Sequence, residues 1–273
     1  MTIILLLAGM SGLLMIVGLI LGGPAGAVLA LCVAWGILLA SPMLLRGRHF
    51  PRAYGRVVHP VEAPRLAAIL SELTDRAELP KRPQIVLARS GQVNAFALRN
   101  PDSPAVGLTR DLLRSLNFRE MAAVLAHEIS HLRLWDMRLL NLSQVLESSV
   151  TTFSLVGAAV FVLHLPFLDI TGIDEILPAL AFLLTAPFAA GALHLAVQRQ
   201  CEYRADFAAV RLCGDPAGLV SALQKMETVR YDFLRFFLSR LARRPSTMLR
   251  THPLTQKRIE RLLALGSRNE LNA

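Results

Sequence analysis

The first 45 residues of this 273-residue chain carry no charged side chain. A helix needs about 20 apolar residues to cross the hydrocarbon layer of a bilayer, so this stretch is long enough for two crossings. We place them at residues 3–22 and 27–45, on either side of a hinge at Gly22, Gly23 and Pro24. So long an uncharged start excludes a disordered tail or a nucleic-acid-binding arm. It makes a membrane protein the leading interpretation.

Two further windows lack charge, at residues 148–168 and 176–198. They fit a chain that is 53% hydrophobic and only 18% charged, where soluble domains are about 25% charged. The predicted fold class is therefore a mainly α membrane protein with four transmembrane helices and a cytoplasmic α+β domain with a small sheet. The predicted domains are an N-terminal transmembrane hairpin (1–45), a first cytoplasmic part (46–147), a second transmembrane hairpin (148–198) and a second cytoplasmic part (199–273).

The distribution of charge predicts the orientation. The chain has a net charge of +9, of which residues 46–147 carry +5 and residues 199–273 carry +7, while the stretch between them carries −3. Basic segments of membrane proteins stay in the cytoplasm, so we expect both basic parts there and the short acidic loop outside. The basic residues are dispersed and lack an aromatic or glycine-rich binding motif, so no nucleic-acid partner is expected.

Four arginines directly follow the second predicted span: Arg46, Arg48, Arg52 and Arg56. Clusters of basic side chains next to a transmembrane helix bind anionic lipid headgroups. We interpret these four as a juxtamembrane anchor.

The cytoplasmic parts read as a mainly helical domain with a few short strands. A capping box of Asn117 and Glu120 predicts the start of a long helix. The sequence Gly-Asp-Pro at residues 214–216 predicts the end of a later one. The other expected elements are strands at 84–88, 93–98 and 105–108 and helices at 64–77, 197–212, 217–229 and 254–265.

The capped helix contains the sequence His127-Glu128-Ile-Ser-His131. Residues four apart share one face of a helix, so both imidazoles can reach one ion. Glu128 lies beside the first of them and can act as a general base. Two histidine ligands and a glutamate base form the arrangement of a zinc hydrolase. The alternative is a surface helix with solvated histidines.

A catalytic zinc site needs a third protein ligand. Glu202, on the helix that follows the last predicted span, is a candidate. Asp206 lies four residues further on the same face, where it can hydrogen-bond a ligating imidazole. The alternative is a solvated acidic stripe paired with Arg199 and Arg204, and spacing alone does not decide between the two.

The order of these motifs resembles the HtpX-type integral-membrane zinc metalloproteases, which are related to the CAAX prenyl proteases. The elements in common are two N-terminal spans, HExxH, a membrane hairpin and a Glu-x-x-Ala-Asp motif that begins at Glu202. The Asn-Ala-Phe-Ala segment at residues 94–97 is similar to one upstream of that family's zinc helix. The Thr-His-Pro motif at 251–253, followed by Arg258, is similar to its C-terminal motif. The resemblance covers about residues 1–265.

The resemblance implies a zincin-like metalloprotease domain that binds one Zn²⁺ per chain. The zinc ligands that it implies are His127, His131 and Glu202, with Glu128 as the general base. It also implies that Asn94 lies at the substrate cleft.

The chain departs from the family pattern at two places. Leu98-Arg99 stands where the family has Thr-Gly, and Leu134-Trp135-Asp136 stands where it has Asn-Gly-Asp. Both departures leave the predicted metal ligands in place. They bear on the subgroup and therefore on the substrates.

The predicted function is hydrolysis of peptide bonds by a membrane-embedded zinc endopeptidase at the cytoplasmic face of a bacterial inner membrane, in membrane-protein quality control or a stress response. Its expected partners are unfolded or membrane protein substrates and the lipid bilayer. The oxyanion needs a second electrophile, for which His252 is the first candidate and Tyr203 the second; a structural role for His252 is the alternative. Two other functions stay open: a membrane sensor that cleaves one dedicated partner, and an inactive membrane scaffold.

Two features of the predicted spans have a packing interpretation. His194, eight residues before Glu202, is suited to an interhelical hydrogen bond, with a proton-relay or ligand-supporting role as the alternative. Gly18 and Gly22 form a GxxxG pair, which in an apolar helix indicates close packing.

Overall fold

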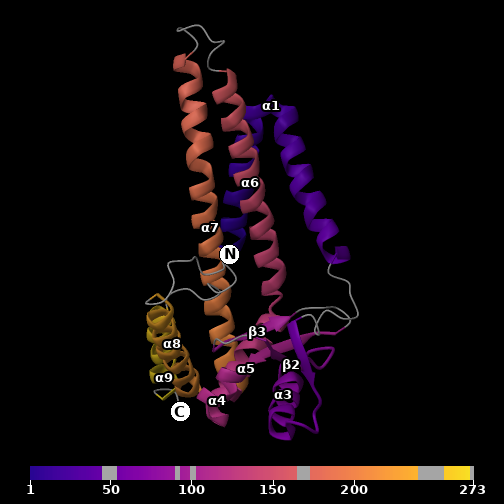
Figure 1. The fold of residues 1–273 in the computed structure, drawn as a ribbon, viewed down its shortest axis with the longest axis vertical. Coiled ribbons are helices and arrows are strands. Elements are labelled where there is room, and N and C mark those ends of the chain that lie inside the picture. Colours follow the sequence, from indigo (N-terminus) through magenta and orange to yellow (C-terminus); the bar gives the residue numbers. More distant parts are fainter. Residues whose placement is uncertain (45–53, 90–92, 99–102, 165–172, 239–254, 271–273) are drawn as a thin grey trace. The chain divides into compact units, whose positions relative to one another are not determined.

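The chain is described by a computed structural model (Figure 1). The structure describes residues 1–44, 54–89, 93–98, 103–164, 173–238 and 255–270. Two compact units are present. Met1–Leu44 and Arg138–Gln200 form one, which we call the helical unit, and Leu45–Met137 and Cys201–Ala273 form the other, which we call the sheet unit.

Helices α1 (Thr2–Leu44), α6 (Asp136–His164) and α7 (Ile173–Cys213) supply the helical unit. Among the described residues, these three helices are long and apolar enough to cross a membrane. The first two residues of α6 and the end of α7 belong to the sheet unit. Each of these helices therefore continues from a membrane-length segment into the other unit.

Helix α1 is broken at Gly22 and Gly23, where we predicted a hinge, and Figure 1 shows it turning back on itself. Gly23 has φ of 59° and ψ of −152°, a conformation that only glycine adopts readily. A Cβ atom on Gly18 would lie 2.7 Å from Cα of Ala27. In one continuous helix these residues would be about 13 Å apart. Gly18 is thus a packing position, as the GxxxG pair predicted, and its contact is with the second arm of α1.

Small side chains fill much of the interior of the helical unit. Its core contains Met10, Leu14, Val17 and Leu183 beside five alanines, Ala30, Ala34, Ala158, Ala186 and Ala190. Small residues let helix backbones approach closely, which replaces the hydrophobic driving force that lipid does not supply. Two hydroxyls in this unit bind their own helix: Ser11 donates to Leu7 O and Thr185 donates to Ala181 O.

The sheet unit contains strands β1 (Gly55–Val58), β2 (Gln84–Ala88), β3 (Ala95–Leu98) and β4 (Ala105–Thr109). Their order is β1-β2-β4-β3. The β1–β2 and β3–β4 pairs are antiparallel and the β2–β4 pair is parallel. Strands β2, β3 and β4 lie where the sequence predicted strands, and β1 was not predicted.

The proposed arginine anchor lies only partly within the described residues. Arg46, Arg48 and Arg52 lie outside them. Arg56 lies in β1 and makes an ion pair with Glu62. Its observed role is therefore within the sheet unit.

Five helices complete the sheet unit together with the end of α7. They are α3 (Pro64–Arg76), α4 (Arg110–Ser115), α5 (Phe118–Arg133), α8 (Pro216–Leu238) and α9 (Thr255–Glu270). Helix α5 packs against β3, β4, α3 and α8, and its Leu125 and Ile129 are fully buried. The helix with the HExxH motif therefore runs through the core of this unit.

The capping box that predicted the start of α5 is confirmed. Asn117 Oδ1 accepts a hydrogen bond from the Glu120 N–H, and Glu120 Oε2 accepts one from the Asn117 N–H, both at 2.9 Å. Glu120 also accepts hydrogen bonds from Ser221 Oγ (2.6 Å) and Lys225 Nζ (2.8 Å) of α8. One carboxylate thus fixes the start of α5 and fastens it to α8.

Candidate metal centre

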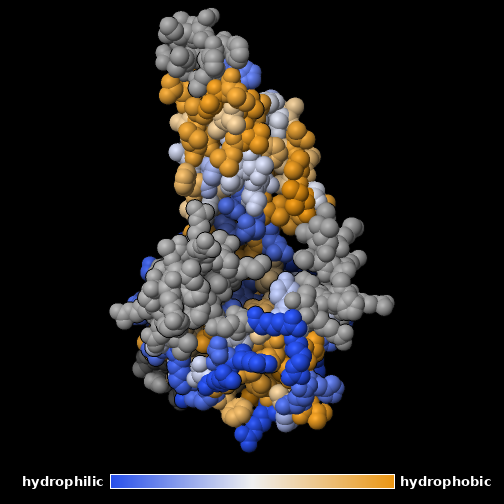
Figure 2. Space-filling model, viewed as in Figure 1, coloured by the Kyte–Doolittle hydropathy of each residue, from blue (hydrophilic) through white to orange (hydrophobic). Residues whose placement is uncertain are grey.

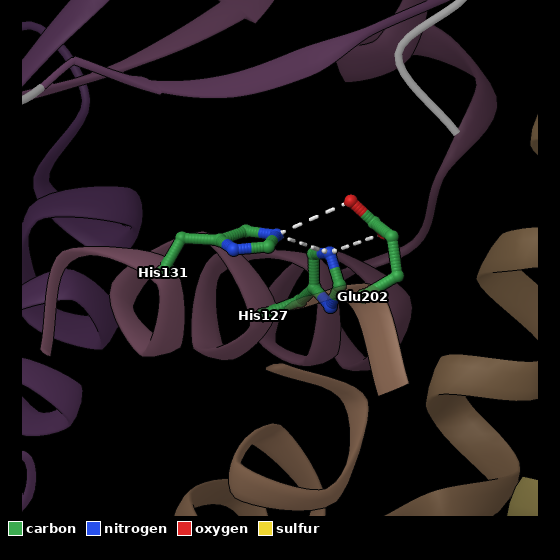
Figure 3. Close-up of side chains that lie close together, drawn as sticks. All are labelled: His127, His131 and Glu202. Atoms are coloured by element: carbon green, nitrogen blue, oxygen red, sulfur yellow. Dashed lines mark hydrogen bonds and ion pairs between the residues drawn. The ribbon is translucent and has the colours of Figure 1, made fainter. Parts of the chain in front are cut away.

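Helix α5 brings the two histidines of the motif together on one face (Figure 3). The His127 and His131 rings are perpendicular, and their Nε2 atoms lie 3.1 Å apart. Glu202 reaches them from α7, with Oε2 3.4 Å from His127 Nε2 and Oε1 3.6 Å from His131 Nε2. All three side chains are buried, and one atom from each lies within 4.8 Å of the others. The three predicted ligands thus converge on one point.

A second carboxylate supports each imidazole from behind. Asp206 Oδ1 lies 3.0 Å from His127 Nδ1, and Asp136 Oδ2 lies 3.1 Å from His131 Nδ1. A proton held on Nδ1 by a carboxylate leaves the lone pair of Nε2 pointing at the centre of the cluster. Asp206 was predicted for this role. Because Glu202 and Asp206 are both buried, the alternative of a solvated acidic stripe is wrong.

Asp136 was not predicted as a partner of His131, because it lies beyond the end of α5. Trp135, between the two helices, has φ of 60°, a left-handed conformation that is strained for any residue with a side chain. This turn brings Asp136, the first residue of α6, back to the metal face of α5. The signal was available in the sequence: the family has glycine at this position, and glycine there indicates a left-handed turn.

Arg258 of α9 joins the two acidic ligands of α7. It is 2% exposed, and its Nε and Nη2 atoms donate to both oxygens of Asp206, at 2.7 and 2.6 Å. Its Nη1 lies 3.0 Å from Glu202 Oε2. In the sequence Arg258 was noticed only as part of a motif. The structure makes it the cation that positions both carboxylates.

The balance of charge in the centre favours a divalent cation. Four buried carboxylates, Glu128, Asp136, Glu202 and Asp206, are accompanied by buried Arg258 and by Arg204, 3.5 Å from Asp136. Among the described residues this leaves two negative charges in excess. Buried charges need partners, and a divalent ion beside two neutral imidazoles would balance them.

The imidazole pKa values reflect the same excess of negative charge. Burial lowers the pKa of His131, but hydrogen bonds to Asp136 and Glu202 outweigh burial and raise it to about 10. The pKa of His127 is also raised, because Asp206 and Glu202 outweigh burial. The cluster therefore attracts positive charge, and its two nitrogen donors and one carboxylate are a ligand set that suits zinc.

The remaining predicted residues are placed less closely. Glu128 is buried on α5, and its charge acts on His131 and Arg258. Asn94 precedes β3, and its backbone exchanges hydrogen bonds with Thr109. Its position at a substrate cleft stays a prediction.

The two candidates for oxyanion stabilisation differ in what the structure describes. Tyr203 follows Glu202 on α7, and the guanidinium of Arg261 lies 3.8 Å from the centre of its ring. His252 lies outside the described residues. Both roles stay predictions.

Comparison with known proteins agrees with this arrangement of helices, sheet and metal-binding side chains. Residues 60–265 match the model of peptidase family M48, and the chain belongs to that family. Over nearly its whole length the chain is also similar to proteins named Protease HtpX homolog. The one from Aquifex aeolicus (strain VF5) is 33% identical over 94% of this chain and 89% of its own length. The one from Gemmatimonas aurantiaca is 30% identical over 97% and 98%.

These matches confirm the resemblance that the motifs suggested: the chain is an HtpX-type protease with membrane-length helices. The family match includes the HExxH helix and extends past Arg258 of α9. All the residues that meet in the candidate metal centre therefore lie within the matched range.

Proposed function

We propose that this chain is a zinc-dependent endopeptidase embedded in the membrane, with its active site on the cytoplasmic side. The observation that carries the proposal is the cluster of His127, His131 and Glu202, in which each imidazole is backed by its own carboxylate. One Zn²⁺ would bind to these three residues. The coarser assignment, an M48 protease, already follows from the family.

The side chains of the centre divide the chemistry among them. A bound zinc ion would supply Lewis acidity to the water and to the scissile carbonyl. Glu128 accepts a proton as the water oxygen bonds to the carbonyl carbon. It then delivers that proton to the amine nitrogen as the carbon–nitrogen bond breaks. Asp206 and Asp136 keep the imidazoles oriented throughout.

The sheet suggests how a substrate is held. Strand β3 lies at one end of the strand order, and among the described residues it pairs only with β4. Helix α5 packs against this strand. A peptide that adds to the free edge of β3 would run beside the metal centre in an extended conformation. This favours unfolded proteins and membrane proteins as substrates, and a role in membrane-protein quality control.

The oxyanion that forms during hydrolysis needs a donor, and we keep His252 as the first candidate and Tyr203 as the second. Loss of one such donor lowers kcat by about 10²–10³-fold. His252→Ala and Tyr203→Phe should therefore be compared at constant zinc content. The variant with the larger loss in kcat identifies the donor.

We further propose four membrane crossings, two of them supplied by the arms of α1, with both basic segments in the cytoplasm. The charge distribution supports this topology, because the net charge of +12 on residues 46–147 and 199–273 faces −3 on the stretch between them. Reporter fusions after residues 45, 170 and 273 test it. Cytoplasmic signals are expected at the first and third, and a periplasmic one at the second.

The function itself is tested by Glu128→Gln in purified full-length protein. Zinc content and cleavage of unstructured casein are measured on the same samples. We expect one zinc per chain and a loss of activity of at least about 10³-fold, because the variant lacks the base. Glu72→Gln, which changes an exposed glutamate of α3, is the matched control and should leave both values unchanged. Casein cleavage that survives Glu128→Gln would overturn the proposal.

A companion variant, Glu202→Ala, tests the third ligand. We expect its zinc content to fall well below one per chain after dialysis against a weak chelator, because two imidazoles alone do not complete the site. Full retention of zinc by this variant would remove Glu202 from the ligand set.

A further inference from the structure

Helix α6 carries a row of exposed polar side chains in the helical unit. Asn141, Gln144, Ser148 and Thr152 are all exposed. Their spacing of three, four and four residues places them on one face of the helix. We call these four residues the polar stripe. It extends for about 16 Å, roughly half the thickness of the hydrocarbon layer.

The polar stripe contrasts with the rest of the exposed surface of this unit. Leu155, Val156, Leu184 and Phe188 are exposed apolar residues on the same two helices, as expected for a surface that faces lipid. Figure 2 shows pale and blue atoms that interrupt the orange surface over α6. A hydrogen-bonding side chain on a lipid-facing surface is costly, so it indicates contact with something other than lipid.

The hydrogen bonds of the stripe differ from those of an isolated hydroxyl in a membrane helix. Thr185 is satisfied by a carbonyl of its own helix. Gln144 instead donates to the Glu147 carboxylate at 2.8 Å and to Ser148 Oγ at 3.3 Å. An amide and a carboxylate together offer more donors and acceptors than these bonds use. The stripe can therefore bind another polar partner.

The stripe is separate from the polar contact that joins α6 to α7. Ser143 Oγ lies 2.9 Å from His194 Nδ1, and Gln198 Nε2 lies 2.9 Å from His194 Nε2. Ser143 and His194 are buried, so this contact is the interhelical hydrogen bond predicted for His194. Packing of α6 against α7 thus uses Ser143, and it leaves the exposed polar face unexplained.

The position of the stripe along the chain relates it to catalysis. Helix α6 begins at Asp136, the carboxylate on His131. The first residue of the stripe, Asn141, follows five residues later. The stripe therefore runs along the helix that starts at the metal centre.

We propose that the polar stripe is the docking face for a membrane-spanning helix of a substrate protein, and that it lowers the cost of unwinding that helix. This inference rests on the proposed function. A peptide must be extended to add to β3, but each unpaired backbone N–H or C=O in lipid costs several kcal/mol. The amide, hydroxyl and carboxylate groups along α6 would bind these freed backbone groups.

Charge argues against a second copy of this chain as the occupant. In a two-fold dimer the same surface meets itself, so Glu147 of each copy would face the other. Two carboxylates brought together in a low-dielectric layer repel. A substrate helix offers backbone donors to the same carboxylate and creates no such repulsion.

The test is a stripe variant that combines Asn141→Leu, Gln144→Leu and Ser148→Ala in the full-length protein, reconstituted in vesicles. Two substrates are compared: a reporter protein with one membrane span, and soluble casein. We expect cleavage of the reporter to fall by about tenfold or more, because three interhelical hydrogen bonds are removed. Casein cleavage and zinc content should stay unchanged. Thr185→Leu, which replaces an exposed polar residue away from α6, is the control and should affect neither substrate.

Equal effects on the two substrates, or no effect on the reporter, would overturn the docking proposal. A photoreactive amino acid at position 144 in the Glu128→Gln background gives a second measurement. It should crosslink to the span of the reporter, whereas a crosslink only to a second copy of the chain would contradict the proposal. Casein cleavage by the wild-type protein tests the proposed function independently, so the two ideas can fail separately.

Discussion

The helical unit and the sheet unit hold their helices together in different ways. In the helical unit, backbones approach at Gly18 and at alanines such as Ala30 and Ala190, and lone hydroxyls bind their own helix. In the sheet unit, a larger aliphatic core surrounds networks of buried charge at Arg258 and Glu120. Close packing suits a solvent that is itself apolar, whereas buried charge must be satisfied completely wherever it occurs. The second arrangement is the one that can bind a metal ion.

The largest effect is expected from Arg258→Met, which removes the buried guanidinium but keeps most of its volume. Asp206 and Glu202 then lose their shared cation, and breaking a buried ion pair from one side costs about 3–5 kcal/mol. We expect the thermal unfolding of metal-free protein to shift down accordingly. Arg261→Met, on the exposed face of α9, is the control. Similar shifts for the two variants would show that burial does not distinguish the two sites.

Close packing in the helical unit is tested by Gly18→Ala. The added Cβ would lie 2.7 Å from backbone atoms of the other arm of α1, and overpacking of this kind costs about 1–3 kcal/mol. Gly12→Ala is a matched control on the same arm, because a Cβ there meets nothing within 4 Å. Stability in detergent should fall for the first variant and stay constant for the second. Zinc content should be unaffected in both.

The two units also differ in the residue that makes a left-handed turn. The helical unit uses Gly23, whereas the sheet unit uses Trp135 with φ of 60°. Relief of this strain in Trp135→Gly should stabilise the protein by about 1–2 kcal/mol relative to Trp135→Ala, which also lacks the ring but keeps a Cβ. Thermal unfolding of the two variants gives the comparison. A less stable glycine variant would mean that the left-handed backbone is not strained.

The smallest effect concerns the pH dependence of the Glu120 network. Burial would raise the pKa of Glu120, but hydrogen bonds from Lys225, Ser221 and the Asn117 backbone outweigh burial and hold it below the ordinary value of 4.5. A lowered pKa in the folded state stabilises the protein above pH 4.5, and that contribution is lost as the pH falls through the folded-state pKa.

We expect Glu120→Gln to lower stability by about 1 kcal/mol at pH 7, the difference between a charged and a neutral hydrogen bond. The difference between variant and wild type should shrink as the pH falls below 4.5. Unfolding midpoints measured from pH 7 to pH 3 provide the check. A constant difference would show that the charge of Glu120 is not involved.

Local patterns predicted the local elements well. The capping box at Asn117, the spacing of His127 and His131 and the hinge at Gly22-Gly23 each depend on residues within one or two turns of one another. Strand β1 was missed because its four residues show no clear alternation and follow a run of arginines. The strand order was not predictable either, because it depends on contacts between distant segments.

The candidate site divides in the same way. Glu202 and Asp206 were found because they share a helix face. Asp136 and Arg258 were not assigned roles, because each reaches the centre through a turn or a helix whose direction is set by tertiary packing. The left-handed backbone at Trp135 is the clearest example, since tryptophan gives no sign of such a conformation.

The metal-binding side chains come from two helices, and the segment between them in the chain includes α6 and the apolar part of α7. On the proposed topology this has a consequence for biosynthesis. Glu202 is translated after both later crossings, so a nascent chain whose second hairpin has not yet entered the bilayer and returned has only the two imidazoles. Hydrolytic activity would therefore arise only in chains that have completed their insertion, and an incompletely translocated protease would leave neighbouring nascent proteins intact.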